Sequence, residues 1–293
     1  MKLVSFWDGD SVVPGVLHPD GVVPLDRRKF PTLESVIEAG SLGIEAAAEA
    51  VERPAVVVVE PKLARPVSRV NSLRDFVAFE DHAKAGAARR GEELNPIWYE
   101  RPIYYKGNPR SLWGPDEDLS IPRFTQELDF ELEVACIIGK RVRDAGEDKA
   151  MDAIFGYTVM NDWSARDVQR QEMAVRLGPS KSKDFATSLG PCIVTADEFP
   201  HPVSARMTAS VNGETVCEAN LADAKWTFPQ IISYVSTGED VWPTDLFGSG
   251  TPFGGCMLDR GGPYLKHNDV IELTVEHIGT LRNRVIQPGT LRQ

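Results

Sequence analysis

The stretch that decides the fold is LDFELEVACIIGK, residues 128–140. Three acids in it, Asp129, Glu131 and Glu133, alternate with apolar residues, and a fully apolar run follows. Because successive side chains of a strand point to opposite faces, the three carboxylates are predicted to share one face. A solvated strand face is one interpretation. However, acids are poor strand formers, like charges in a row repel, and the strand soon becomes apolar on both faces.

Carboxylates beside a buried segment need a compensating charge, because burial otherwise raises their pKa values until they take up protons. A hard divalent cation held by oxygen ligands supplies that charge. Two carboxylates on one strand form a chelating arm but not a complete site. The sequence therefore indicates that further acids arrive from elsewhere in the chain.

The segment NDWSARDVQRQ, residues 161–171, offers one of these acids. Asp162 stands at the end of the strand-like FGYTVM and precedes a predicted helix over 164–173. Capping of this helix is the alternative role for Asn161, Asp162 or Ser164. Arg166 and Gln169 are three residues apart on the helix, so their side chains are predicted to point the same way.

The segment RDFVAFEDH, residues 74–82, offers Asp75 and His82, which are seven residues apart. If residues 75–82 are helical, this spacing is close to two turns and brings both side chains to one face. A surface role is the alternative for each of them. The polar stretch that follows, up to WYERPIYY, is either a mobile flap or an ordinary surface segment.

Composition limits the class of partner. The chain has 293 residues, 42% hydrophobic and 26% charged, with a formal net charge of −11. An excess of acid argues against nucleic acid as a partner but permits a small anionic substrate in a locally cationic pocket. No apolar run approaches the ~18 residues of a membrane span, and the N-terminus lacks a signal-peptide pattern. Four widely spaced cysteines are expected to be buried free thiols, and we expect a cytoplasmic location.

Two domains are predicted, a small β-rich N-terminal domain over 1–68 and a larger domain over 69–293. In the first, Asp-Gly pairs predict hairpin turns, residues 32–52 are helical in composition but broken by Gly40 and Gly43, and AVVVVE over 55–60 resembles a β-branched strand. The second alternates short strands with loops and few helices. The fold class is therefore mixed α/β and dominated by β-structure.

Six segments carry a resemblance to a known family. They are, in order, DFVAFEDH, LDFELEVACIIGK, FGYTVMNDWSARDVQ, LGPSKSKDFATSLGP, GSGTPFGGCMLD and NDVIELTVEHIGTLRNRV. Together they resemble the fumarylacetoacetate hydrolase family from about residue 70 to residue 286. The resemblance implies a C-terminal β-sandwich roll behind a smaller N-terminal domain, a homodimer, and kinship with the bacterial members.

The resemblance also implies a metal centre. The family's carboxylate ligands match Asp75, Glu131, Glu133 and Asp162, a set that suits Mg²⁺ or Ca²⁺, with Mn²⁺ as a further candidate. Asp129 is not a family ligand, and we expect it either to support the ligands or to be solvated.

The catalytic and substrate-binding residues implied by the family follow from the same motifs. His82 matches the histidine that activates water, and Asp259 matches its acid partner, which is usually glutamate. The substrate-binding and polarising residues match Lys183, Arg166, Gln169, Thr251 and, less closely, Tyr105. The family's pocket arginine has no assured match, although Arg89 or Arg90 could serve, and Val77 replaces a family tyrosine.

Three functions remain open from the sequence. The first is metal-dependent hydrolysis of a C–C bond in a β-diketone acid, such as fumarylacetoacetate or an acylpyruvate, as in aromatic catabolism; a base with an orienting acid favours it. The second is decarboxylation, isomerisation or dehydration of a 2-oxo or hydroxydienoate acid on the same platform. The third is a non-catalytic metal-stabilised binding module, which would need no such base.

Overall fold

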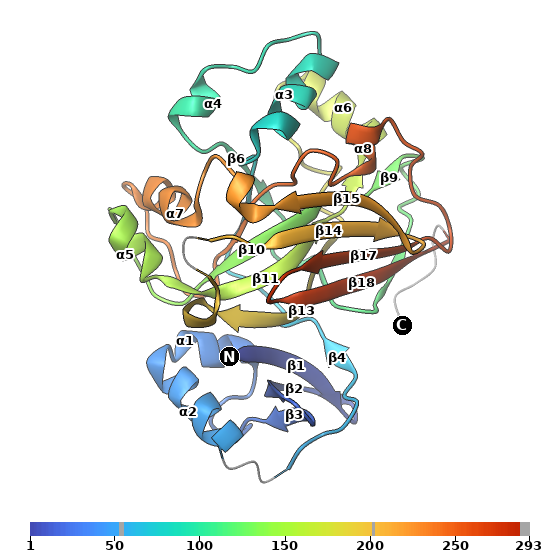
Figure 1. The fold of residues 1–293 in the computed structure, drawn as a ribbon. Coiled ribbons are helices and arrows are strands. Elements are labelled where there is room, and N and C mark those ends of the chain that lie inside the picture. Colours follow the sequence, from blue (N-terminus) through green and yellow to red (C-terminus); the bar gives the residue numbers. More distant parts are fainter. Residues whose placement is uncertain (53–55, 201–202, 288–293) are drawn as a thin grey trace.

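Two facing β-sheets organise the molecule (Figure 1), described by a computed structural model over residues 1–52, 56–200 and 203–287. In these ranges the larger sheet has eleven strands, which are β1 (Lys2–Asp8), β2 (Ser11–His18), β3 (Gly21–Pro24), β4 (Leu63–Ala64), β5 (Leu73–Phe76), β6 (Tyr104–Gly107), β7 (Leu112–Trp113), β10 (Leu132–Ile138), β11 (Ile154–Asp162), β13 (Thr187–Thr195) and β16 (Leu246–Gly248). Its main path runs β3-β2-β1-β13-β11-β10-β16-β5-β6. Strand β10, which carries Glu133 of the acidic stretch, therefore lies among the inner strands of this sheet.

The smaller sheet covers the central strands of the larger one. Its order is β15-β14-β17-β18-β8, and its strands are β8 (Asp118–Ser120), β14 (Arg206–Val211), β15 (Glu214–Asn220), β17 (Val270–Val275) and β18 (Gly279–Ile286). A short ladder joins β9 (Leu128–Asp129) to β12 (Ser164–Ala165). This sheet-on-sheet arrangement confirms the prediction of a mixed, β-dominated fold.

The helices lie around the sheets. They are α1 (Leu33–Glu38), α2 (Ser41–Glu52), α3 (Glu80–Arg89), α4 (Ile97–Glu100), α5 (Glu147–Met151), α6 (Arg166–Ala174), α7 (Phe228–Ser236) and α8 (Met257–Arg260), with 3-10 turns η1 (Ala196–Glu198) and η2 (Leu221–Asp223). Figure 1 shows α3, α4, α6 and α8 gathered at one end of the molecule, away from the N-terminal strands. None of the helices in the described part of the chain is long and apolar enough to cross a bilayer.

Strand β10 explains why the sequence after the acids is apolar on both faces. Leu132, Val134, Cys136 and Ile138 enter the core between the two sheets, whereas Ala135 and Ile137 enter a second core on the opposite face. All seven residues of the strand are buried. Because successive side chains of a strand point to opposite faces, β10 contributes side chains to two hydrophobic cores.

The N-terminal residues extend the larger sheet instead of forming a sheet of their own. Strand β1 is hydrogen-bonded to β13 through the pairs Lys2↔Val194 and Leu3↔Ile193. The second core likewise joins Leu3 of the first 68 residues to Leu189 of the remainder. The division into domains at residue 68 stays a prediction, and the sheet runs across it.

The N-terminal hairpins form as predicted, with turns between β1 and β2 and between β2 and β3. The predicted break of the helical stretch 32–52 at Gly40 is confirmed, because Gly40 lies between α1 and α2 with a φ of +58°, whereas Gly43 lies inside α2 and does not interrupt it. The predicted strand over 55–60 is wrong for its described residues, because Val58 makes only an isolated bridge to Val22. Residue 55 lies outside the described residues.

Candidate metal and catalytic site

Four buried carboxylates converge at one end of the larger sheet. Asp75 comes from β5, Glu133 from β10 and Asp162 from the last position of β11, while Glu131 directly precedes β10. One oxygen of each lies within 4.8 Å of the others, and none of the four residues is more than 5% exposed. The pairing of β10 with β11 and with β16, and of β16 with β5, brings these distant residues together.

Two cations partly neutralise this carboxylate cluster. Lys183 Nζ lies 2.5 Å from Glu131 Oε2 and also donates to Asp162 Oδ2. Arg166 Nη2 donates to Glu131 Oε1 at 2.7 Å. Tyr105 Oη donates to Asp162 Oδ2 at 2.7 Å, a neutral contact that adds no charge. Four carboxylates thus face two cations, one of which is shared with Asp129.

The pKa values show how the excess negative charge is distributed. Burial and the charge of Asp162 raise the pKa of Asp75 well above its usual range, and burial with the charges of Asp75 and Asp162 does the same for Glu133. Burial also raises the pKa of Asp162, although Lys183 opposes this. For Glu131, burial is outweighed by Lys183 and Arg166, so its pKa is lowered. The cluster therefore lacks positive charge on the side of Asp75 and Glu133.

Two observations indicate that a divalent cation would fit between these four carboxylates. Glu133 Oε1 and Asp162 Oδ1 are buried and have no hydrogen-bond partner among the described residues, and such atoms are rare in folded proteins. In addition, a Cβ at Gly248 would meet Asp75 Oδ1 and would lie 2.9 Å from Glu133 Oε2, so glycine leaves this space to the carboxylates. An all-oxygen donor set of this kind suits Mg²⁺, Ca²⁺ or Mn²⁺.

Asp129 has a different role from its neighbours in the acidic stretch. It ends β9, is fully buried, and accepts hydrogen bonds from Arg166 Nε at 2.8 Å and from Met257 N and Leu258 N at 2.9 and 3.0 Å. The solvated alternative is therefore wrong. Asp129 fixes Arg166, which in turn orients Glu131, and it binds the first turn of α8.

His82 and Asp259 form a hydrogen-bonded pair beside the carboxylates. His82 Nδ1 lies 2.8 Å from Asp259 Oδ2, and Arg89 Nη2 donates to Asp259 Oδ1 at 2.5 Å. Burial opposes ionisation of Asp259, but hydrogen bonds and charge from His82 and Arg89 prevail and lower its pKa. Asp259 is thus an ionised acceptor that can orient the imidazole of His82 through Nδ1.

The local structure corrects two expectations about this region. Residues 75–82 are not one helix, because Asp75 lies in β5 and His82 in α3, and the irregular residues 77–79 connect the two elements. Two elements, not two turns of one helix, bring the residues to the same site. The N-cap of α6 is Ala165, which makes no side-chain cap, so Asn161, Asp162 and Ser164 do not cap this helix.

A cavity of about 1330 Å³ opens above the carboxylates and contains most of the candidate residues. Its wall includes, among others, Asp75, His82, Tyr105, Glu131, Arg166, Gln169, Lys183 and Thr251. Glu133, Asp162 and Asp259 do not line it and lie behind this wall. Residues 92–98, from the stretch expected to be either a mobile flap or an ordinary surface segment, form part of the wall, and both alternatives stay predictions.

The cavity is richer in cations than the sequence analysis indicated. Besides Arg166 and Lys183, it is lined by Arg89, Arg90, Arg170 and Arg176. Arg170 forms a double hydrogen bond with Glu127, and Arg166 Nη1 donates to Gln169 Oε1 at 2.9 Å. Arg166 and Arg170 form the cationic wall of α6, for which their helical spacing was the available signal, whereas the other four cations come from other segments.

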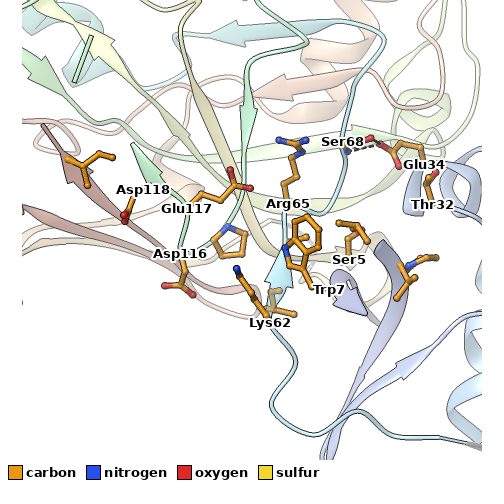
Figure 2. Close-up of a pocket in the computed structure, with 17 residues that line it drawn as sticks. Ser5, Trp7, Thr32, Glu34, Lys62, Arg65, Ser68, Asp116, Glu117 and Asp118 are labelled. Atoms are coloured by element: carbon orange, nitrogen blue, oxygen red, sulfur yellow. Dashed lines mark hydrogen bonds between the residues drawn. The ribbon is translucent and has the colours of Figure 1, made fainter. Parts of the chain in front are cut away.

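Figure 2 shows a second cavity, about 720 Å³ in volume, between the N-terminal strands and residues 115–118. Its Glu34 already accepts hydrogen bonds from Ser68 N and Ser68 Oγ at 2.6 and 2.7 Å. Neither of the two metal-type donor clusters found among the described residues lies in this cavity. The chemistry therefore belongs to the larger cavity.

Comparison with known proteins agrees with this geometry. The model of the fumarylacetoacetate (FAA) hydrolase C-terminal family matches residues 72–286. The chain is 31% identical to 2,4-didehydro-3-deoxy-L-rhamnonate hydrolase of a Sphingomonas species, over 97% of this chain and 96% of that protein. It is 29% identical to oxaloacetate tautomerase FAHD2A of Homo sapiens, over 98% and 92% of the respective chains.

Among solved structures, fumarylacetoacetate hydrolase from the psychrophile Exiguobacterium antarcticum superimposes with a TM-score of 0.78 at 26% identity, covering 98% of this chain and 99% of that one. The family match covers most of the chain, including each residue of the carboxylate cluster and of the His82–Asp259 pair. The chain belongs to the fumarylacetoacetate hydrolase family.

Proposed function

We propose that this enzyme is a metal-dependent hydrolase that cleaves a C–C bond in a β-diketone acid, such as fumarylacetoacetate or an acylpyruvate. The observation that carries the proposal is the His82–Asp259 pair, with Nδ1 and Oδ2 2.8 Å apart, in which His82 lies on the wall of the cavity that contains Glu131 and Lys183. A metal-stabilised binding module would need carboxylates but no imidazole held by an ionised acid.

Asp75, Glu131, Glu133 and Asp162 would hold the cation, which the excess of buried carboxylate supports. A divalent cation at such a site polarises a substrate carbonyl and stabilises negative charge on a leaving enolate. Tyr105, through its bond to Asp162, and Arg166, through its bond to Glu131, fix the orientation of these carboxylates.

The proton transfers belong to His82. Its Nε2 takes a proton from water, and the water oxygen attacks the carbonyl carbon. The C–C bond then breaks, its electron pair leaves with the neighbouring carbon, and the imidazolium returns the proton to that carbon. Asp259 keeps the ring in the required tautomer throughout. The products are a carboxylic acid, which keeps the water oxygen, and a ketone acid, which takes up the returned proton. All atoms of water and substrate are thereby accounted for.

The remaining cavity residues recognise the substrate in this proposal. Lys183, Gln169 and Thr251 line the cavity beside the cluster and can donate hydrogen bonds to a substrate carboxylate or to a developing oxyanion. The cationic wall of α6 favours an anionic oxo acid over a neutral compound. A small anionic substrate is therefore compatible with an acidic protein of net charge −11.

Tautomerisation of a 2-oxo acid is the second candidate, because the human relative of similar identity and coverage is an oxaloacetate tautomerase. There, His82 would take a proton from carbon instead of water, with no change in the residues involved. Decarboxylation or dehydration of such an acid would use the same carboxylate cluster and cavity residues.

The test is an activity screen of the full-length protein loaded with Mg²⁺ or Mn²⁺. The panel contains fumarylacetoacetate, acylpyruvates, oxaloacetate and hydroxymuconate-type acids, and products are identified by mass in parallel reactions in ¹⁸O-labelled water and in D₂O. Hydrolysis places one ¹⁸O atom in the new carboxylate. Exchange of carbon-bound hydrogen without cleavage would support tautomerisation, and no turnover on the whole panel would argue against the hydrolase proposal.

A further inference from the structure

A second cluster of metal-type donors lies beside the carboxylate cluster and shares no residue with it. It contains His82, Cys256 and Asp259, and one donor atom of each lies within 4.8 Å of the other two. His82 is the third residue of α3, while Cys256 directly precedes α8 and Asp259 lies within that helix. Residues from two elements that are far apart in sequence thus bring a nitrogen, a sulfur and an oxygen donor together.

The thiol of Cys256 is buried and makes no hydrogen bond to the described residues. Cys256 is the N-cap residue of α8, yet its side chain makes no capping bond. Burial, opposed in part by Arg166, raises the pKa of this thiol well above its usual range. A thiol of this kind is unreactive by itself but loses its proton when it coordinates a metal.

The donor types distinguish this cluster from the carboxylates. Mg²⁺ and Ca²⁺ prefer oxygen ligands, whereas imidazole and thiolate are ligands of Zn²⁺ and Co²⁺. The spacing Cys256-x-x-Asp259 corresponds to the short C-x₂-C spacing that zinc sites commonly use, and residues three apart at a helix start lie on one face.

The cluster also has the access that a metal ion needs. His82 lies on the wall of the large cavity, and Cys256 and Asp259 lie behind it, so an ion that enters from the cavity reaches the three donors beside the imidazole and can keep a water molecule as a fourth ligand. Three protein ligands and one open position are the usual composition of an accessible zinc site. Asp259 can ligate through Oδ2, now 2.8 Å from His82 Nδ1, while Oδ1 keeps its bond to Arg89.

We propose that His82, Cys256 and Asp259 form a site for Zn²⁺ or a similar borderline-soft cation, separate from the oxygen-only carboxylate cluster. The ion replaces the proton between Nδ1 and Oδ2, and its binding releases that proton and the thiol proton. Occupation also removes the imidazole from its role as a base. This inhibitory consequence rests on the proposed function, whereas the binding itself does not.

Co²⁺ is the most direct probe, because thiolate-bound Co²⁺ absorbs in the near ultraviolet through sulfur-to-metal charge transfer. Full-length protein saturated with Mg²⁺ is titrated with Co²⁺. Displacement of Mg²⁺ from the carboxylates adds no such band, since those ligands are all oxygen. The charge-transfer band is expected in the wild type, and it should saturate at one equivalent.

Two variants assign the band to its sulfur. Cys256→Ser should abolish it, while Cys217→Ser, at a buried cysteine outside the cluster, should retain it. Thermal melting checks that both variants fold. A wild type without the band overturns the proposal whatever the variants do, and so does a folded Cys256→Ser protein that keeps the band.

Zn²⁺ inhibition then tests the consequence. With Mg²⁺ in excess, Zn²⁺ should inhibit turnover at the concentration that fills the site in competition with a chromophoric chelator. Cys256→Ser should raise that concentration by about tenfold or more, since even the loss of an outer partner of a metal ligand costs this much affinity. If the cobalt band appears but Zn²⁺ binding leaves turnover unchanged, the site exists and the role of His82 as base is wrong.

Discussion

At the scale of single residues, Glu133 and Asp162 are the clearest sign of a bound cation. Each has one buried oxygen without a partner, and each belongs to a group of four carboxylates that two cations cannot neutralise. Since an uncompensated buried charge lowers the free energy of unfolding, the metal-free protein carries a stability penalty for the site.

Glu133→Gln should remove part of this penalty. The pKa of Glu133 is raised above its unfolded value by burial and by Asp75 and Asp162, so its carboxyl group destabilises the metal-free fold at neutral pH. In EDTA at pH 7, the variant should unfold with a free energy higher by on the order of 1 kcal/mol. The difference should shrink as the pH falls towards about 4, where unfolded glutamate also takes up its proton. Lower stability of the variant at pH 7 would contradict this.

His82→Ala should separate catalysis from metal binding. The imidazole contacts Asp259 and is not among the four carboxylates, so the variant should keep its Mn²⁺ affinity while kcat falls by about 10² to 10⁴. Steady-state kinetics and Mn²⁺ titration of the same preparation measure both quantities. Unchanged kcat would exclude His82 as the base.

At the scale of elements, the acidic strand was predictable and its neighbours were less so. Alternation of acids with apolar residues singled out Glu131 and Glu133, but the predicted single strand is divided, because Asp129 belongs to β9 and Glu131 stands between β9 and β10. The conditional expectation of one helix over 75–82 failed because tertiary pairing of β5 with β16 and β6 overrides the local preference.

The residues that support the site were not accessible from local sequence. Asp129 was expected to be solvated or supporting, and only the contact with Arg166 and α8 decides between these. The pairing of Arg89 with Asp259 joins residues 170 positions apart. The family resemblance matched Asp259 to the histidine's acid partner but left the arginine open.

Strand β16 separates β5 from β10, and Gly248→Ala should test how its backbone makes room for the carboxylates. The added methyl group would meet Asp75 Oδ1 and Met160 Cε, in a strand position that is fully buried. The variant should lose most of its Mn²⁺ affinity and about 1–3 kcal/mol of stability. Calorimetric titration and denaturant unfolding are the measurements, and wild-type metal affinity would contradict the placement of the ligands.

At the scale of the whole molecule, the larger sheet joins the N-terminal residues to the chain that carries the site. Strand β1 pairs with β13, and β13 pairs with β11, which ends at Asp162. The homodimer and the division into two domains at residue 68 stay predictions.

Deletion of residues 1–68 should therefore unfold the remainder. The truncation exposes the edge of β13 and opens the second core, where Leu3, Val16 and Leu33 pack with Leu189 and Ile193. Circular dichroism and near-ultraviolet spectra of the truncated chain should show loss of cooperative melting. A folded truncated protein that binds Mn²⁺ would instead favour an independent C-terminal domain.

The most direct measurement is the metal content of the full-length protein after equilibration with Mn²⁺ and removal of free ion. Elemental analysis should give one Mn²⁺ per wild-type chain and almost none in Asp75→Asn, with both proteins folded by circular dichroism. No bound Mn²⁺ in the wild type, or equal content in the two proteins, would contradict the convergence of these four carboxylates on a single ion.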